Sequence, residues 1–273
     1  MLPQPLPLLS IVTTSYNQSG FIEETIQSVI NQSYPFIEYI IVDGGSTDGT
    51  HEILKKYNEN IDVVIIESDR GPADALNKGF SVATGEYFAF LNSDDTYDTN
   101  FVDLTLSALL SSGSDLVYSD VRFIDKYSKP ITPYRFPLAY AVSVSPKKLL
   151  AKACIIPQQG SIWSRRLFDS GIRFNEENTT CWDLEFYVEA VCAGFCIQPV
   201  HHCLSNFRLH DSSITGESLF SSPNHINSRA NRRLTDHARI KKTLIDHGFS
   251  CSSVESYLLR IDNLIRRSFR LLS

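Results

Sequence analysis

The chain has 273 residues, a formal net charge of −6 at pH 7, and contents of 42% hydrophobic and 21% charged residues. This composition is that of an ordinary globular protein and excludes disordered, collagen-like and low-complexity chains. The acidic balance argues against a general nucleic-acid-binding protein, so we expect no nucleic acid among its partners.

Strand and helix patterns alternate through the first hundred residues. Short apolar or β-rich runs predict strands over residues 8–14, 37–42, 62–66 and 86–91. Helical spacing predicts helices over residues 20–31, 50–57 and 72–83. This alternation predicts a mostly parallel sheet covered on both faces, with its ligand outside the carboxyl ends of the strands. The segments at those ends are 13–17, 43–49 and 92–95.

The second half of the chain has a less regular pattern. We predict helices over 104–110 and 182–194, strands over 116–118 and 196–204, and an extended stretch over 160–163. The proline-containing stretch 127–148 is expected to be a loop, and the polar stretch 217–227 a linker.

The distribution of charge and cysteine along the chain bears on its location. Residues 229–273 hold ten Lys/Arg and four Asp/Glu, a local charge of +6, which leaves −12 for residues 1–228. No run reaches the roughly 18 apolar residues of a transmembrane helix, and the proline-broken start lacks a basic region. The six cysteines lack paired zinc-ligand spacings, even with His201 and His202 beside Cys203. We therefore expect a cytoplasmic protein with free, mostly buried thiols.

Carboxylates follow two of the predicted strands. Asp43 ends the run IEYIIV and could accept hydrogen bonds from a base or ribose, although Asp-Gly is also an ordinary turn dipeptide. Asp94 and Asp95 follow the run EYFAFLN. Two adjacent carboxylates repel one another, so Mg²⁺ or Mn²⁺ shared with substrate phosphates is the natural arrangement, and a capped turn is the alternative.

Four segments in order resemble the family 2 glycosyltransferases of the GT-A fold. They read SIVTTSYN, VDGGSTDGT, GPADALNKG and GEYFAFLNSDD, and a looser match runs through PQQGSIWSRRLF, WDLEFYVEAVCAG and FRLHDSSITG. The resemblance implies a GT-A domain over residues 1–216, an α/β sandwich with a mostly parallel sheet. Residues 217–273 would then form a C-terminal helical extension.

The resemblance also implies transfer of a sugar, with inversion, from a nucleotide-sugar donor that is usually UDP-linked. The residues at its nucleotide-sugar positions are Thr14, Tyr16, Asp43, Asp48, Asp74, Asn77, Lys78, Asn92 and Asp94. Asp95 matches the direct ligand of Mn²⁺ or Mg²⁺, with His210 as a further ligand and Arg208 facing phosphate. Asn92 departs from the common acid at its position, and Gln158 and Gln159 are placed at the acceptor pocket.

An inverting transfer needs a base that takes the proton of the acceptor hydroxyl. The family places this acid at the start of a helix, and here we select Asp183. Glu185 is the reserve, one alignment puts Cys181 at the position, and the alternative role of Asp183 is to cap the helix.

The C-terminal residues lie outside the resemblance. From Val254 onward, apolar residues spaced by three and four predict an amphipathic helix decorated with arginines. It suits the inner face of the cell membrane and a lipid-linked acceptor, but equally a helix docked on the domain or the seam of a homo-oligomer.

Two other functions stay open at this point. A nucleotidyltransferase uses similar carboxylates, but residues 15–20 lack its glycine-rich triphosphate loop. A non-catalytic partner that binds a nucleotide sugar is the second alternative, which Asn92 and Cys181 keep open. The leading prediction is a glycosyltransferase that modifies a saccharide or lipid-linked acceptor in polysaccharide biosynthesis.

Overall fold

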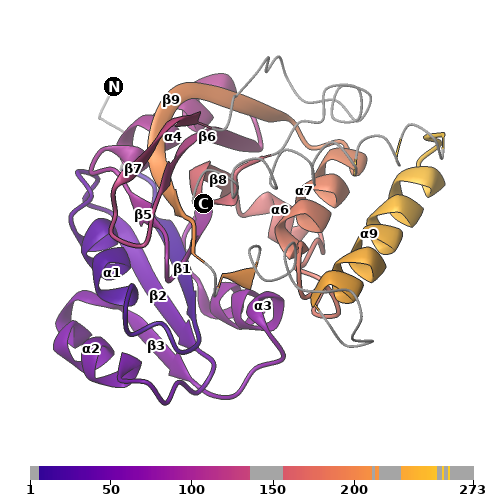
Figure 1. Cartoon of the computed structure of the whole chain (residues 1–273). Helices are drawn as coiled ribbons and strands as arrows, with labels where there is room; N and C mark the ends of the chain where they lie inside the picture. The colour runs from indigo at the N-terminus through magenta and orange to yellow at the C-terminus, as the bar shows by residue number, and fades with distance from the viewer. Residues whose placement is uncertain are drawn as a thin grey trace.

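The computed structural model describes residues 6–135, 156–210, 213–214, 229–250, 254 and 258. Within these residues nine strands form one sheet in the order β3-β2-β1-β4-β8-β6-β9-β5, with β7 paired to β6 (Figure 1). The strands are β1 (Leu9–Ser15), β2 (Ile37–Asp43), β3 (Val63–Ile66), β4 (Tyr87–Asn92), β5 (Thr96–Tyr97), β6 (Leu116–Ile124), β7 (Pro130–Arg135), β8 (Ser161–Ser164) and β9 (Ile197–Arg208).

The strand directions confirm a mostly parallel sheet. β2 is parallel to both β1 and β3, β4 is parallel to β1, and β9 is parallel to β6. Both β4 and β6 are antiparallel to β8, so they run in the same direction as each other. Strands β5, β7 and β8 run against the six others.

Helices cover both faces of the sheet, as expected for a doubly wound fold. On one face lie α1 (Ile22–Ile30), α2 (Thr50–Lys56) and α4 (Phe101–Ser112), which share one buried apolar cluster. On the other lie α3 (Pro72–Val82), α6 (Arg166–Asp169), α7 (Trp182–Cys192) and α9 (Arg229–Asp246), which share the second cluster. Two short 3₁₀ helices, η1 (Asn58–Asn60) and η2 (Gln158–Gly160), complete the described elements.

The alternation of strand side chains builds these two clusters. Ile11 of β1 and Ile41 of β2 point to the α1 face, whereas Val12 and Val42 point to the α3 face. Every residue of β1 is buried, which is typical of a parallel strand covered on both sides. A Cβ at Gly79 would lie 2.5 Å from Val12 Cγ1, so glycine lets α3 approach the sheet closely.

Aromatic rings fix α7 and the segment before it on the α3 face. Phe174 stacks on Phe186 of α7 with ring centroids 4.4 Å apart, and it also stacks on Phe80 of α3 at 6.1 Å. Trp163 of β8 packs against Phe80 and Phe186 at 5.5 Å each. Such pairs stabilise by about 0.5–1.5 kcal/mol beyond the burial of their surface, so this region is firmly packed.

The described part of the C-terminal region packs on the body of the protein. Helix α9 lies beside α7 (Figure 1), and its Ile240 and Leu244 are fully buried in the cluster that contains α7. Val254 and Leu258 belong to the same cluster. The other residues of the apolar stripe from 254 onward, the linker 217–227 and the boundary at 216–217 lie outside the described residues.

Several boundaries differ from the sequence-based expectation. The loop predicted over 127–148 is wrong for residues 130–135, which form β7. Among the described strands β7 pairs only with β6, so proline can lie on its other edge, where no amide donor is needed. Strand β6 reaches Ile124 and not residue 118, helix α4 begins at Phe101, and β5 has only two residues, too few to show a period.

Two further expectations can be compared with the described residues. Cys181, Cys192, Cys196 and Cys203 are free, although only Cys181 is buried. Cys154 and Cys251 lie outside the described residues. None of the helices in the described part of the chain is long and apolar enough to cross a membrane.

Candidate functional site

The predicted site segments meet at one edge of the sheet. Thr14 in β1 is the register partner of Asn92 in β4, and Ser15 is the partner of Asp43 in β2. The carboxyl ends of three neighbouring parallel strands therefore bring these polar residues side by side. The sequence predicted this juxtaposition because the strand ends alone determine it.

Asp43 is enclosed by the loop that follows it. Its Oδ1 accepts hydrogen bonds from the backbone N–H of Gly45 at 3.1 Å and of Ser46 at 2.8 Å, and contacts His51 Nε2 at 2.9 Å. Its Oδ2 accepts from Ser46 Oγ at 2.7 Å. Burial raises the pKa of Asp43, but the bonds from Ser46 and His51 outweigh burial and leave the pKa below its ordinary value. Asp43 thus shapes the loop with both of its oxygens.

Asp48 ties this loop to the start of α1. Its carboxylate accepts from the backbone N–H of Ser19 at 2.8 Å and from the hydroxyl of Thr50 at 2.7 Å. Burial raises the pKa of Asp48, yet these bonds dominate and lower it to about 2. Asn17, at a positive φ of 54°, accepts from the backbone N–H of Thr47 at 2.9 Å. The two loops that follow β1 and β2 are therefore one hydrogen-bonded unit.

Gly44 lies between an exposed ring and a carboxylate that the sequence reasoning missed. A Cβ on Gly44 would lie 2.6 Å from Asp69 Oδ2 and 3.3 Å from the ring of Tyr16, which is 62% exposed. Burial, with the nearby charges of Asp74 and Asp43, raises the pKa of Asp69. Asp69 could have been identified from the sequence, because it lies between strand β3 and the Gly71-Pro72 start of α3, just before Asp74.

The three predicted residues of α3 make mostly local contacts. Asp74 accepts from the backbone N–H of Arg70 at 2.9 Å. Lys78 forms an ion pair with Glu67 at 2.9 Å and lies 3.6 Å from Asp74.

Asn77 bridges α3 to a distant segment. Its Nδ2 donates to the carbonyl of Phe174 at 2.8 Å, and its Oδ1 accepts the N–H of Phe174 at 3.1 Å. Asn77 therefore joins α3 to the segment before α7, a role that the sequence did not indicate.

Asp95 is held inside the protein by three donors. Its Oδ1 accepts the backbone N–H of Arg208 at 2.9 Å, and its Oδ2 accepts from Gln159 at 2.7 Å and Gln158 at 3.2 Å. The side chain has no exposed surface, and burial together with the charge of Asp94 raises its pKa well above the ordinary value. The backbone of Arg208 and the side chains of Gln158 and Gln159 therefore hold the Asp95 carboxylate in place.

Asp94 lies at the tip of the turn, beside His210. The turn closes through a hydrogen bond of 3.1 Å from the N–H of Asp95 to the carbonyl of Asn92. His210 Nε2 lies 3.0 Å from Asp94 Oδ2, and the Asp94 side chain keeps 13% of its surface exposed. Among the described residues, no three or more His, Cys, Asp or Glu side chains form a ready metal site. Asp94 and His210 place a carboxylate and an imidazole side by side at this turn.

Arg208 is a buried support and does not face the solvent. Its Nε donates to the carbonyl of Asp94 at 2.7 Å, and its guanidinium also contacts Ser128 at 2.8 Å and Glu24 at 2.8 Å. The side chain is 1% exposed. Arg208 therefore holds the turn that carries Asp94. The sequence suggested that Arg208 faces phosphate, but the side chain is buried and does not reach the surface.

Asp183 lies in the first turn of α7, where its Oδ1 accepts the N–H of Leu184 at 2.8 Å. It lies four residues before Tyr187, so the two share one helix face, and the pKa of Tyr187 is raised mainly by burial, with the charge of Asp183 as a smaller contribution. The Tyr187 hydroxyl is 2.6 Å from Ser161 Oγ, which donates to the carbonyl of Gln158, one of the Asp95 supports. Burial is the main cause that raises the pKa of Asp183.

Glu185 and the thiol of Cys181, also at the start of α7, are less accessible than Asp183. Glu185 accepts from Asn175 at 3.0 Å and from Asn178 at 2.6 Å, one bond on each oxygen. Burial raises the pKa of the Cys181 thiol to about 12.

Comparisons with known proteins identify relatives of this chain among glycosyltransferases. The chain is 30% identical over 213 residues to the putative teichuronic acid biosynthesis glycosyltransferase TuaG of Bacillus subtilis, covering 77% of this chain and 82% of TuaG. It is 31% identical over 122 residues to the UDP-Glc:alpha-D-GlcNAc-diphosphoundecaprenol beta-1,3-glucosyltransferase WfgD of Escherichia coli, covering 44% of this chain and 48% of WfgD.

Solved structures share the fold at low sequence identity. S. aureus TarS in complex with UDP-GlcNAc matches with a TM-score of 0.71 and 19% identity, over 92% of this chain and 70% of TarS. The mannosyltransferase PcManGT of Pyrobaculum calidifontis, in complex with GDP-Man and Mn²⁺, matches with a TM-score of 0.62 and 15% identity, over 98% of this chain and 85% of that chain. The profile of Glycosyl transferase family 2 matches residues 10–179. The strand-end site and these matches together show that the chain belongs to glycosyl transferase family 2.

Proposed function

We propose that this glycosyltransferase moves a sugar from a UDP-linked donor to a hydroxyl of a saccharide or lipid-linked acceptor, with inversion, in the synthesis of a surface polysaccharide. The observation that carries the proposal is the Asp94–His210 pair at the end of β4, beside the ends of β1 and β2. The names of TuaG and WfgD and the UDP-GlcNAc bound to TarS favour this donor and acceptor class.

Asp94 and His210 suit a divalent cation that is shared with the donor. A carboxylate and an imidazole are both ligands of Mn²⁺, and Mg²⁺ is commonly held by one or two carboxylates plus substrate phosphates. When bound, the cation neutralises charge on the departing diphosphate. Asp95, saturated by Arg208 and two glutamines, supports the turn from behind and is not assigned as a ligand.

Asp183 is the base of the proposed reaction. Its carboxylate accepts the proton of the acceptor hydroxyl while that oxygen bonds to the anomeric carbon of the donor. The bond from this carbon to the diphosphate breaks at the same time, and its electron pair leaves with the diphosphate. Attack from the opposite side inverts the anomeric configuration, and the raised pKa of Asp183 makes it a stronger base than an exposed aspartate.

The neighbours of Asp183 are poorer bases. Both oxygens of Glu185 already accept hydrogen bonds from asparagines, and Glu185 is 2% exposed. Cys181 is buried, and with a pKa of about 12 it stays a neutral thiol at physiological pH. Among these three side chains, Asp183 is the one that is not fully buried. Its Oδ1 accepts a hydrogen bond from the N–H of Leu184.

A donor screen tests the proposal. The wild-type chain is incubated with UDP-, GDP- and dTDP-sugars, with Mn²⁺, Mg²⁺ or EDTA, and nucleotide release is measured with and without an undecaprenyl-diphosphate-sugar acceptor. We expect UDP release that depends on the cation and increases with the acceptor. Binding of UDP-sugars without release of UDP under every condition would instead identify a non-catalytic partner of another transferase.

The location and assembly of the protein are further parts of the proposal. Val254 and Leu258 are buried in the body of the protein, so only the arginine-rich residues after Leu258 could attach the chain to the inner face of the membrane, which would suit a lipid-linked acceptor. The alternatives are a homo-oligomer through those residues and a helix docked on the domain. Flotation with anionic liposomes tests the membrane, and sedimentation of the full chain tests the homo-oligomer; a monomer that does not float supports the docked helix.

A further inference from the structure

The segment over residues 174–181, just before α7, is held by three different helices. Asn77 of α3 binds the backbone of Phe174 from one side. Glu185 of α7 binds the side chains of Asn175 and Asn178. The third set of contacts comes from α9, which follows more than forty residues later in the chain. This convergence determines where α7 begins.

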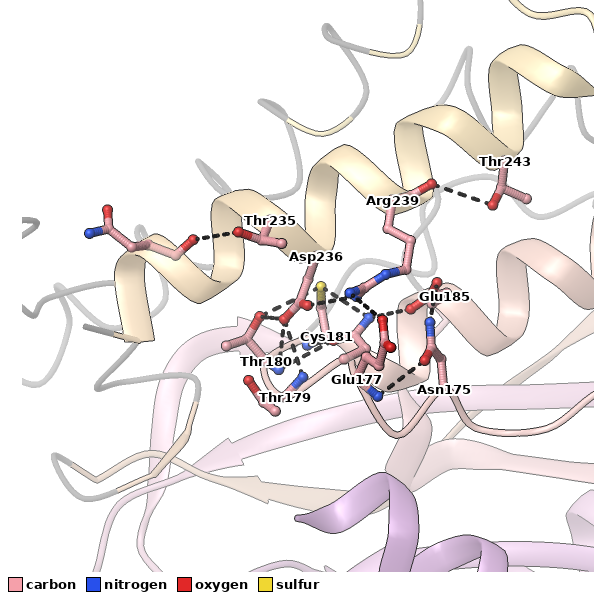
Figure 2. Close-up of polar contacts among 12 residues, drawn as sticks. Asn175, Glu177, Thr179, Thr180, Cys181, Glu185, Thr235, Asp236, Arg239 and Thr243 are labelled. Atoms are coloured by element: carbon pink, nitrogen blue, oxygen red, sulfur yellow. Dashed lines mark hydrogen bonds and ion pairs between the residues drawn. The ribbon is translucent and has the colours of Figure 1, made fainter. Parts of the chain in front are cut away.

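Asp236 makes the central contact from α9 (Figure 2). Its Oδ2 accepts hydrogen bonds from the backbone N–H of Thr179 at 3.2 Å, and from the backbone N–H and hydroxyl of Thr180 at 3.1 and 2.6 Å. Its Oδ1 accepts from Arg239 Nη1 at 3.0 Å. The side chain of Asp236 is 3% exposed. A buried carboxylate with four donors is costly to disturb, so the turn is fixed relative to α9.

Two other features make α9 a firm support for this contact. Arg239 also contacts Glu177 at 3.2 Å, which adds a second polar link to the same segment. Ile240 and Leu244 are fully buried against the cluster that contains α7. Apolar packing therefore holds the helix, and Asp236 transmits its position to the turn.

The turn at Thr179–Thr180 determines the position of the candidate base, Asp183. Helix α7 begins at Trp182, two residues after Thr180, and Asp183 is its second residue. A shift of the turn displaces the first turn of the helix and the carboxylate that it carries. Misplacement of a reacting group by about 1 Å can lower a rate by about 10²-fold. Asp236 itself is saturated and buried, so it is unsuited to take a proton from an acceptor.

We propose that Asp236 is a positioning residue for glycosyl transfer, which acts from α9 on the turn at Thr179–Thr180 and so sets where Asp183 meets the acceptor. The inference rests on the proposed function, because it needs Asp183 to be the base. It gives the region after residue 229 a part in the reaction, although the family profile ends at residue 179.

The test compares Asp236→Asn and Thr180→Val with the wild-type chain in steady-state transfer assays at saturating acceptor. We expect kcat to fall by about tenfold to a hundredfold in Asp236→Asn, with the KM for the donor and the affinity for UDP unchanged. Thr180→Val keeps nearly the same volume and removes the 2.6 Å hydroxyl bond to Asp236, together with a weak 3.8 Å contact to Cys181 Sγ. It therefore still tests the inference if Asp236→Asn does not fold. Thr180→Ser retains the hydroxyl and should restore kcat.

The control is Asp246→Asn at the end of α9, which removes an exposed ion pair with Lys242 and should leave kcat unchanged. A merely structural role of Asp236 predicts lower melting temperatures for both test variants but wild-type kcat well below melting, and that result would overturn the inference. If the wild-type chain itself releases no nucleotide from any donor, the proposed function fails instead.

Discussion

Adjacent residues Asp94 and Asp95 should respond differently to substitution by asparagine. Asn at 95 keeps the shape of the buried side chain, and its Oδ1 can still accept the N–H of Arg208. The amide of Gln158 can turn to accept from the new Nδ2, since its Oε1 has no hydrogen-bond partner among the described residues. Asn at 94 removes the carboxylate that faces His210, so it removes the charge of the proposed cation site.

The expected magnitudes follow from the contacts. Asp95→Ala leaves three buried donors unsatisfied, at about 1–3 kcal/mol each, so the chain should lose at least about 3 kcal/mol of its free energy of unfolding. Asp95→Asn forfeits about one of these hydrogen bonds, or about 1 kcal/mol. Asp94→Asn should lower the affinity for UDP with Mn²⁺ by about 100-fold or more, since even outer-shell changes cost 10–100-fold.

Calorimetric titration of UDP in the presence of Mn²⁺, together with urea unfolding, measures both quantities on the same samples. We expect Asp95→Asn to bind UDP nearly as the wild type does, and Asp94→Asn to be as stable as the wild type but to bind poorly. A folded Asp95→Asn that loses cation-dependent binding, beside an Asp94→Asn that retains it, would refute the assignment and make Asp95 the direct ligand.

Other predictions concern the base, its charge environment and the α3 contact. Asp183→Asn should lower kcat by about 10²–10⁴-fold with little change in the donor KM, measured by steady-state kinetics. Because the pKa of Asp183 is raised and its ionised form is the active one, kcat should fall as pH drops through that pKa. Removal of a neighbouring positive charge in Arg233→Gln should move this acid limb to higher pH. Asn77→Ala should cost about 1–3 kcal/mol in urea unfolding while UDP affinity stays unchanged, contrary to a direct nucleotide contact.

The fold was largely predictable because its parallel strands are buried on both faces. The runs at 37–42 and 86–91 match β2 and β4 to within one residue at each end. The errors fall where that signal is weak. Pro130 and Pro133 suggested a loop, yet an edge strand accommodates them, and the two residues of β5 are too few to show alternation.

The location of the site could be predicted from the sequence, but the contacts of its individual side chains could not. Strand ends put Thr14, Asp43 and Asn92 together, and that needs no knowledge of side chains. The partners of individual residues depend on segments far along the chain. Asn77 pairs with Phe174, and the carboxylate of Asp95 with Gln159 and the backbone of Arg208, and no local pattern records either contact.

Hydrogen bonds within the chain also change how the acidic excess of residues 1–228 should be interpreted. A count of carboxylates suggests a face that repels a diphosphate strongly. Asp43, Asp48 and Asp95, however, each accept three or more hydrogen bonds from the chain itself. These bonds stabilise the charges of Asp43 and Asp48, whereas burial and the charge of Asp94 disfavour the charge of Asp95 and raise its pKa. Asp94 and Asp183 remain as the carboxylates of the proposed reaction.

Two basic side chains of the predicted site, Arg208 and Lys78, are also engaged within the chain. Arg208 is buried against Glu24 and the carbonyl of Asp94, and Lys78 is paired with Glu67 and lies near Asp74. A departing diphosphate still needs positive charge in the transition state. With both side chains engaged elsewhere, we expect the cation proposed at Asp94 and His210 to supply that charge, and the buried contacts of Asp95 to hold the turn that carries Asp94.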